Sequence, residues 1–156
     1  MRAAVTRAHL IVLATLGSAA VLAGAFVFQA FGYAPCHLCL LQRWPHAAAI
    51  LIGVLALVSG WRLLPWLGAA AAMTTAGLGL YHTGVERQWW QGPTTCTSGS
   101  IAGVDPKALL DQILAAPIVR CDEVAWQMLG LSMASWNAVA SLVLAGIWIA
   151  AVRRVA

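Results

Sequence analysis

Four cysteines are the residues of this sequence best suited to chemistry, and they fall into two pairs. Cys36 and Cys39 form a C-x-x-C motif directly after a proline, whereas Cys96 and Cys121 are widely separated in the second half of the chain. A disulfide across two intervening residues closes almost no loop and contributes little stability. A C-x-x-C at a helix N-terminus is instead the arrangement that favours a reactive thiolate. The Cys36/Cys39 pair therefore predicts redox chemistry.

The second pair has more than one interpretation. A bridge from Cys96 to Cys121 would close a loop worth about 3.5 kcal/mol by the chain-entropy relation, so a purely structural disulfide is a serious alternative. A four-thiolate metal site needs two closely spaced pairs, which this spacing does not supply, and no metal is expected. A c-type haem needs histidine directly after the second cysteine of C-x-x-C, where this chain has Leu40.

Arg43 follows Cys39 by four residues and shares its helix face. An uncompensated arginine at membrane depth costs up to about 3 kcal/mol, so the guanidinium needs a partner. The thiolate of Cys39 or a reduced, oxygen-bearing cofactor would serve. The alternative is an arginine that extends to lipid phosphates.

The elements that position these residues are membrane helices. Hydrophobic residues make up 62% of the 156 residues and charged residues 9%, a composition that excludes an ordinary soluble surface and a large soluble catalytic domain. Apolar runs of roughly 20 residues each predict spans. We expect one all-α membrane domain over residues 1–156, a four-helix bundle with spans at about 10–30, 44–59, 63–82 and 133–152, the second extending outward to Cys36 if its helix begins at Pro35.

Residues 84–132 form a long loop between the third and fourth spans, and a loop of this length is usually functional. Asp105 and Pro106 resemble an N-cap and a first helical residue, so a short amphipathic helix is expected there. It would lie on the membrane surface or pack on the loop itself.

The charges predict the orientation. The net charge is +4, but the basic residues are not clustered as a nucleic-acid-binding face requires. By the positive-inside rule both termini should be cytoplasmic and the acidic 84–132 loop outside, which places all four cysteines on the side where disulfides persist. The arginines outside that loop on which this rests are Arg2, Arg7, Arg62, Arg153 and Arg154.

Several stretches match, in order, the pattern of one known family: Pro35-Cys36-His37-Leu38-Cys39-Leu40-Leu41-Gln42-Arg43-Trp44-Pro45, Tyr81-His82-Thr83-Gly84, Cys96, Cys121 and Trp126–Trp136. In these residues the sequence resembles the disulfide bond formation protein B (DsbB) family, quinone-linked thiol oxidases of the bacterial inner membrane. Gln42 departs from the pattern where relatives can carry an acid, and His37 has no assigned role.

The resemblance implies a route for electrons. A reduced periplasmic thioredoxin-like partner of the DsbA type would attack Cys96, and Cys121 would carry the reducing equivalents to Cys36. Cys39 would then be released as a thiolate against a quinone (ubiquinone or menaquinone), with Arg43 stabilising the charge on that cofactor and His82 lining the same site. Membrane lipid is the other partner expected, and nucleic acid is not.

Other functions remain open from the sequence. His46 and His82 near the outer ends of adjacent spans could ligate a b-type haem in an electron carrier. A structural membrane protein with incidental disulfides is a third possibility. Vitamin K epoxide reductase-like enzymes share the chemistry, but in them the loop cysteines precede the C-x-x-C, the reverse of the order here.

Overall fold

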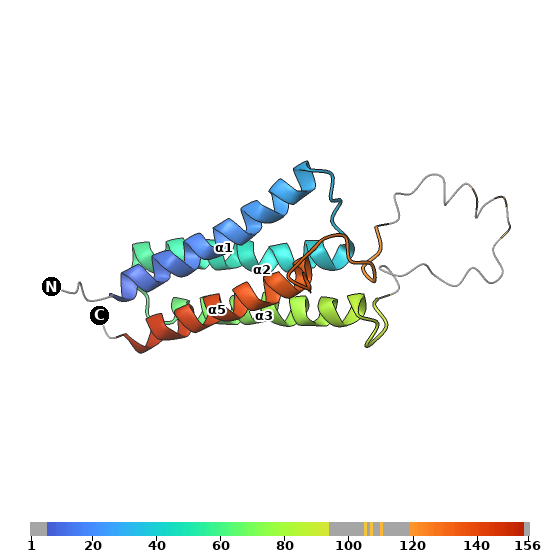
Figure 1. Cartoon of the computed structure of the whole chain (residues 1–156). Helices are drawn as coiled ribbons and strands as arrows, with labels where there is room; N and C mark the ends of the chain where they lie inside the picture. The colour runs from blue at the N-terminus through green and yellow to red at the C-terminus, as the bar shows by residue number, and fades with distance from the viewer. Residues whose placement is uncertain (1–5, 94–104, 106, 108–109, 111–118, 155–156) are drawn as a thin grey trace.

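The computed structural model describes residues 6–93, 105, 107, 110 and 119–154. Long helices dominate this part of the chain (Figure 1), and the predicted all-α fold class is confirmed. The helices are α1 (Arg7–Ala30), α2 (His37–Ser59), α3 (Leu64–Glu86) and α5 (Met133–Arg153). Cys96 and most of the predicted amphipathic helix lie outside the described residues.

α2 begins at His37, so the helix extends outward beyond the predicted span start at residue 44 as far as the C-x-x-C, the extension predicted for a helix that begins near Pro35. Cys36 is its N-cap, and the Cys36 thiol accepts a hydrogen bond from the backbone N–H of Cys39 at 3.2 Å. Pro45 lies inside the helix and interrupts one backbone hydrogen bond without ending it. The helix ends at Gly60, whose φ of 66° is a left-handed conformation that glycine adopts without strain.

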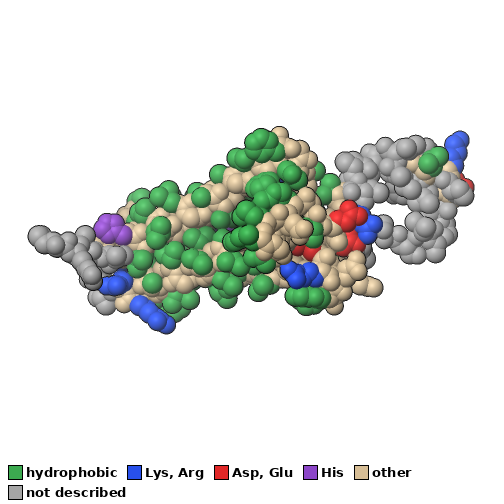
Figure 2. Space-filling view, viewed as in Figure 1, with side chains coloured by type: hydrophobic (Ala, Val, Ile, Leu, Met, Phe, Trp, Pro, Cys, Tyr) green, Lys and Arg blue, Asp and Glu red, His purple; other side chains and the backbone are tan. Residues whose placement is uncertain are grey.

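Three helices, α1, α2 and α5, are long and apolar enough to cross a membrane. α3 is as long as α2, and it packs against both α2 and α5, but glycines and threonines lower its hydropathy. Hydrophobic side chains cover the visible flank of the bundle, and the charged side chains gather at its ends (Figure 2). Large apolar side chains such as Leu16 and Val58 are 61% and 83% exposed, which suits contact with lipid. The protein is therefore a multi-pass membrane protein.

Small residues let the helices approach closely. Gly68 of α3 lies against the fully buried Trp148 ring of α5, and a Cβ at this glycine would come within 2.6 Å of the indole. Gly53 of α2 faces Thr15 of α1 in the same way. These contacts hold the four helices in one bundle.

The segment before α5 forms a small antiparallel hairpin of β1 (Gln127–Met128) and β2 (Leu131–Ser132). Its two turn residues, Leu129 and Gly130, both have positive φ, as a type I′ turn requires. Ser132 then caps α5 by accepting the N–H of Ser135 at 3.2 Å. The hairpin lies at the end of the bundle that also carries the start of α2 and the end of α3 (Figure 1).

Candidate functional site

The C-x-x-C dithiol lies at the N-terminus of α2. Cys36 and Cys39 are free thiols whose sulfurs are 2.7 Å apart, and Cys36 is 4% exposed. The hydrogen bond with Cys39 and burial raise the pKa of Cys36 well above the ordinary range of a thiol. Cys36 therefore keeps its proton in the reduced pair, against what its position at a helix N-terminus alone would suggest.

Cys121 joins this dithiol from the loop before the hairpin. It is fully buried and disulfide-bonded. Its sulfur, the Cys36 sulfur and a ring nitrogen of His82 all lie within 4.8 Å of one another. A metal ion would need thiolate ligands, and a disulfide sulfur is not one, so this cluster fits sulfur exchange better than metal binding.

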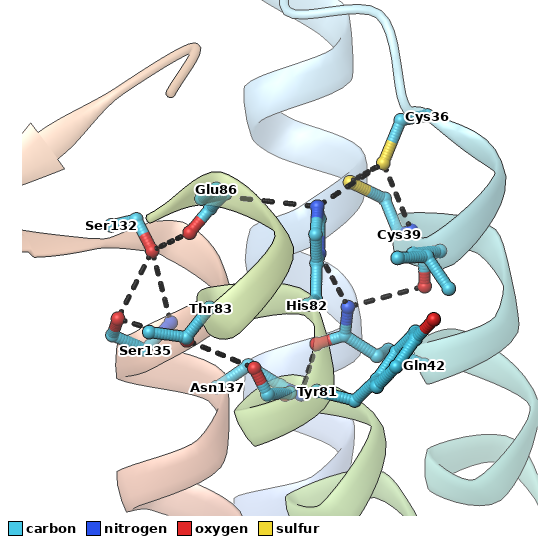
Figure 3. Close-up of polar contacts among 12 residues, drawn as sticks. Cys36, Cys39, Gln42, Tyr81, His82, Thr83, Glu86, Ser132, Ser135 and Asn137 are labelled. Carbon is cyan, nitrogen blue, oxygen red and sulfur yellow. Dashed lines mark hydrogen bonds and ion pairs between the residues drawn. The ribbon is translucent and has the colours of Figure 1, made fainter. Parts of the chain in front are cut away.

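His82 of α3 lies between the dithiol and a set of buried polar side chains (Figure 3). It is 3% exposed. Its Nε2 is 3.6 Å from the Cys36 sulfur and 3.9 Å from a carboxylate oxygen of Glu86, and the ring also hydrogen-bonds the backbone of Cys121. Its Nδ1 is 3.0 Å from the amide nitrogen of Gln42. His82 is thus in contact with both sulfur-bearing segments.

Gln42 continues these contacts into the bundle. Its side-chain oxygen accepts from the Asn137 amide at 2.7 Å, and the same amide nitrogen is 3.2 Å from the hydroxyl of Thr75. The other end of the Asn137 amide lies 2.9 Å from Nε2 of His46. No role for Gln42 or Asn137 could be predicted from the sequence, because their 95-residue separation gives no sign of contact.

Glu86 is a second kind of site residue that was not predicted from the sequence. It lies one helical turn after His82, and its carboxylate accepts a hydrogen bond from the Ser132 hydroxyl. From the sequence it counted only as one of the acids of the outer loop. Its spacing of four residues from His82 could have predicted the contact, because side chains four residues apart lie on the same face of a helix.

A cavity of about 380 Å³ opens beside Cys39, between the second half of α1 and the other helices. Its wall is mainly apolar. Phe28 of α1 and Trp126 of the loop both line it and pack on each other with ring centroids 5.0 Å apart. The polar side chains in the wall are Cys39, Gln42, Arg43, His46, His82 and Asn137.

Arg43 lines this cavity but is held by α1. Its terminal nitrogens donate to the Gln29 side chain at 2.8 Å and to the Ala25 carbonyl at 3.3 Å, and its guanidinium lies 4.8 Å from the centroid of the Phe26 ring. Its Nε is buried and has no hydrogen-bond partner among the described residues. The guanidinium is thus held by neutral acceptors, and its buried Nε–H makes no hydrogen bond to the described residues.

The segment entering Cys121 has its own ion pair. Arg120 donates to both carboxylate oxygens of Asp122, at 2.9 and 2.7 Å. The guanidinium holds the pKa of the Asp122 carboxyl below its usual range. This bidentate contact spans Cys121 and orders the backbone on both sides of it.

An all-α membrane bundle with a buried dithiol next to a disulfide-bonded loop cysteine defines a membrane thiol oxidoreductase. The family comparison agrees with this class. The chain belongs to the family of the disulfide bond formation protein DsbB, whose family model matches residues 7–151.

The chain is similar to proteins from three bacteria. It is 28% identical over 136 residues to a disulfide bond formation protein B of Haemophilus ducreyi, covering 83% of this chain and 76% of that protein. A disulfide bond formation protein B of Marinobacter nauticus is 30% identical over 144 residues, covering 81% and 80%. The uncharacterized protein RP370 of Rickettsia prowazekii is 29% identical over 113 residues, and the chain spans 64% of its length. No solved structure matches.

Proposed function

We propose that the protein is a membrane thiol:quinone oxidoreductase that reoxidises a periplasmic DsbA-like disulfide donor and passes the electrons to ubiquinone or menaquinone. The observation that carries the proposal is the meeting of three groups: the Cys121 and Cys36 sulfurs lie within 4.8 Å, and Cys39 opens onto the cavity. One sulfur of the loop pair, the C-x-x-C pair and the cavity thus follow one another in the order that the proposed electron flow requires.

The sulfur chemistry balances as four exchanges. A thiolate of the reduced partner attacks Cys96 of the loop disulfide, the S–S bond to Cys121 breaks, and Cys121 leaves as a thiolate. Cys121 then attacks the sulfur of Cys36 in an oxidised Cys36–Cys39 pair, and the electron pair leaves on Cys39. The second thiolate of the partner attacks the partner sulfur of the mixed disulfide and releases Cys96, and Cys96 attacks Cys121 and releases Cys36, so that the loop disulfide re-forms and the C-x-x-C pair is left reduced. Over the full cycle the partner loses two electrons and two protons, and the acceptor gains them.

The cavity next to Cys39 suits a quinone. Its apolar wall fits a flat ring with an isoprenoid tail, and Arg43 supplies a cation for a ring oxygen. A bound quinone supplies a two-electron, two-proton acceptor more oxidising than a thiol. Such an acceptor is needed because the reduction potential of a DsbA-type partner is near about −120 mV, whereas that of an ordinary structural disulfide is below about −300 mV. Oxidation of the partner dithiol by such a disulfide would cost roughly 8 kcal/mol.

The proposed orientation places both termini in the cytoplasm and the cysteines on the periplasmic side of a bacterial inner membrane. The orientation depends on arginines that lie together at one end of the bundle. Arg7 supports this, because its side chain donates to the backbone carbonyls of Gly60 and Trp61 at 3.3 and 3.1 Å. The N-terminal arginine and the Arg62 turn therefore share one end of the bundle, opposite the dithiol. Positive charge gathered there favours the cytoplasmic side.

Haem ligation by His46 and His82 is less favourable. Each ring already hydrogen-bonds an amide side chain, Asn137 for His46 and Gln42 for His82. Binding a haem iron between them would break a buried network.

The test uses the purified protein with a reduced thioredoxin-like dithiol protein and a short-chain ubiquinone or menaquinone analogue. Loss of quinone absorbance, matched by loss of partner thiols, is the expected result, and Cys36→Ala should abolish it. The matched control is Ser141→Ala, a buried polar change on α5 away from the site. Absence of turnover with both quinones by the wild-type protein would overturn the proposal.

A further inference from the structure

The amide side chains of Gln42 and Asn137 connect His82 to the interior of the bundle (Figure 3). We infer that Asn137 and Gln42 are positioning residues that fix the tautomer of His82, so that its Nε2 carries the proton and faces the Cys36 sulfur. The consequence for exchange between Cys121 and Cys36 rests on the proposed function, whereas the tautomer itself does not.

Two backbone carbonyls settle which way the amides point. One side-chain atom of Gln42 lies 3.1 Å from the carbonyl oxygen of Leu38, and a carbonyl only accepts, so that atom must be the NH₂ group. The Thr75 hydroxyl gives its single hydrogen to the carbonyl oxygen of Gln42 at 3.2 Å. It therefore presents a lone pair to Asn137, and the Asn137 atom facing it must also be NH₂.

The tautomer of His82 follows from this orientation. The NH₂ of Gln42 points at Nδ1 of His82 at 3.0 Å, so Nδ1 must offer a lone pair. A hydrogen on Nδ1 would face the amide hydrogens. The neutral ring therefore carries its hydrogen on Nε2, the nitrogen that lies 3.6 Å from the Cys36 sulfur.

The same reasoning reaches the other end of the network. The Asn137 oxygen lies 2.9 Å from Nε2 of His46 and only accepts, so this nitrogen is the protonated one of the 2% exposed ring. The hydrogen bonds then form one series with a single direction. His46 donates to Asn137, Asn137 donates to Gln42, Gln42 donates to His82, and the remaining ring N–H of His82 faces Cys36. Side chains from α2, α3 and α5 form this one directed chain.

The charged groups around His82 agree with a donor at Nε2. Glu86, on the same helix, has a carboxylate oxygen 3.9 Å from Nε2. The Cys36 sulfur approaches Nε2 from the start of α2, and the backbone of Cys121 in the loop also accepts from the ring, so the Nε2 hydrogen lies between two acceptors that belong to the exchanging cysteines. An N–H here stabilises the negative charge that the exchanging sulfurs share while Cys121 attacks Cys36.

The direct test is nitrogen-15 NMR of the full-length protein with labelled histidine, with His82 assigned from the signal lost in His82→Gln. In the wild-type protein Nε2 should be protonated and Nδ1 should not. Asn137→Leu should give a mixture of tautomers, while the control Ser141→Ala, on the same helix and also buried, should leave the signal unchanged. A wild-type proton on Nδ1, or an unchanged tautomer in Asn137→Leu, would overturn the inference.

Gln42→Glu is the second variant, in case Asn137→Leu fails to fold. It keeps the size of the side chain but replaces the NH₂ donor with an acceptor. The expected result is a proton on Nδ1 of His82, and an unprotonated Nδ1 would count against tautomer control by Gln42.

A kinetic measurement separates this inference from the proposed function. Under single turnover with excess reduced partner and no added quinone, Asn137→Leu should slow electron transfer from the loop pair to the C-x-x-C pair roughly tenfold relative to Ser141→Ala, a step that does not involve quinone binding. No turnover in the wild-type protein would refute the proposed function and leave the tautomer result standing. Normal turnover in Asn137→Leu with an altered tautomer would refute the positioning role alone.

Discussion

Arg43 offers the sharpest test of the acceptor site. Its terminal nitrogens are held by Gln29 and Ala25 of α1, while its buried Nε–H has no partner among the described residues. Arg43 is therefore already fixed at the cavity wall, and each terminal nitrogen carries a second hydrogen that is left for a quinone oxygen. Replacing it by alanine removes the charge and the donor but leaves the helix intact.

The size of the effect follows from the type of contact. A hydrogen bond to a charged group contributes about 1.5–3 kcal/mol, and its value increases as the ring oxygen gains negative charge. Arg43→Ala should therefore weaken apparent quinone affinity and slow quinone reduction by roughly tenfold or more, since each factor of ten corresponds to about 1.4 kcal/mol. Arg43→Lys keeps the charge but loses the planar fork, so its effect should be intermediate.

Gln29→Ala supplies a third point in the series. It removes one neutral hydrogen bond that orients Arg43 and leaves the guanidinium in place, so a change of about two- to fivefold is expected, or about 1 kcal/mol or less. The predicted order of impairment is Arg43→Ala, then Arg43→Lys, then Gln29→Ala.

The assay is quinone-reduction kinetics with saturating reduced partner across a range of quinone concentrations. Circular dichroism and thermal unfolding of each variant check that the bundle is intact. An unchanged profile for Arg43→Ala would mean that this side chain only anchors α1 to α2. The acceptor site would then have to be sought elsewhere, with His82 tested first.

The remaining predictions concern the cysteines. A membrane-impermeant maleimide applied from the periplasmic side should label reduced Cys96 in intact cells, whereas the fully buried Cys121 should be protected; labelling of Cys96 only after lysis would reverse the proposed orientation. Cys96→Ser should block electron entry, whereas Cys121→Ala should accumulate a mixed disulfide between Cys96 and the partner on non-reducing gels; normal turnover in both variants would make the loop pair structural. Because Cys39 is the main cause of the raised pKa of Cys36, Cys39→Ala should lower that pKa, so that modification of Cys36 by methyl methanethiosulfonate begins at a lower pH. An unshifted pH profile would mean that burial alone controls Cys36.

The helices could be predicted from the sequence because each is a continuous apolar run bounded by turn residues. The start of α2 was predicted as two alternatives, near residue 44 or further out at Pro35. The N-cap at Cys36 provides the earlier start, and Pro45 is accommodated inside the helix. Both starts carry a local proline signal, so the choice between them depends on packing.

The site was predictable only where its residues are close in sequence or match the family pattern. Cys36, Cys39 and Arg43 lie within two turns of one helix, so their relation follows from helical geometry. Asn137 meets Gln42 across the bundle only because α5 and α2 both pack against α3, and that packing depends on contacts such as the one between Gly68 and Trp148. Nothing local in either residue predicts that meeting.

The loop that carries Cys121 is anchored to the bundle on both sides of the site. Trp126 packs on Phe28 of α1, and Arg87 at the end of α3 donates to the carbonyl of Gly130 at 3.3 Å. These contacts hold a fully buried Cys121 sulfur near Cys36, so transfer between the two pairs is intramolecular and does not require that segment to undock. A folded partner protein, by contrast, has no access to a sulfur with no exposed surface. The burial of Cys121 therefore supports entry of electrons at Cys96, with Cys121 kept for transfer to Cys36.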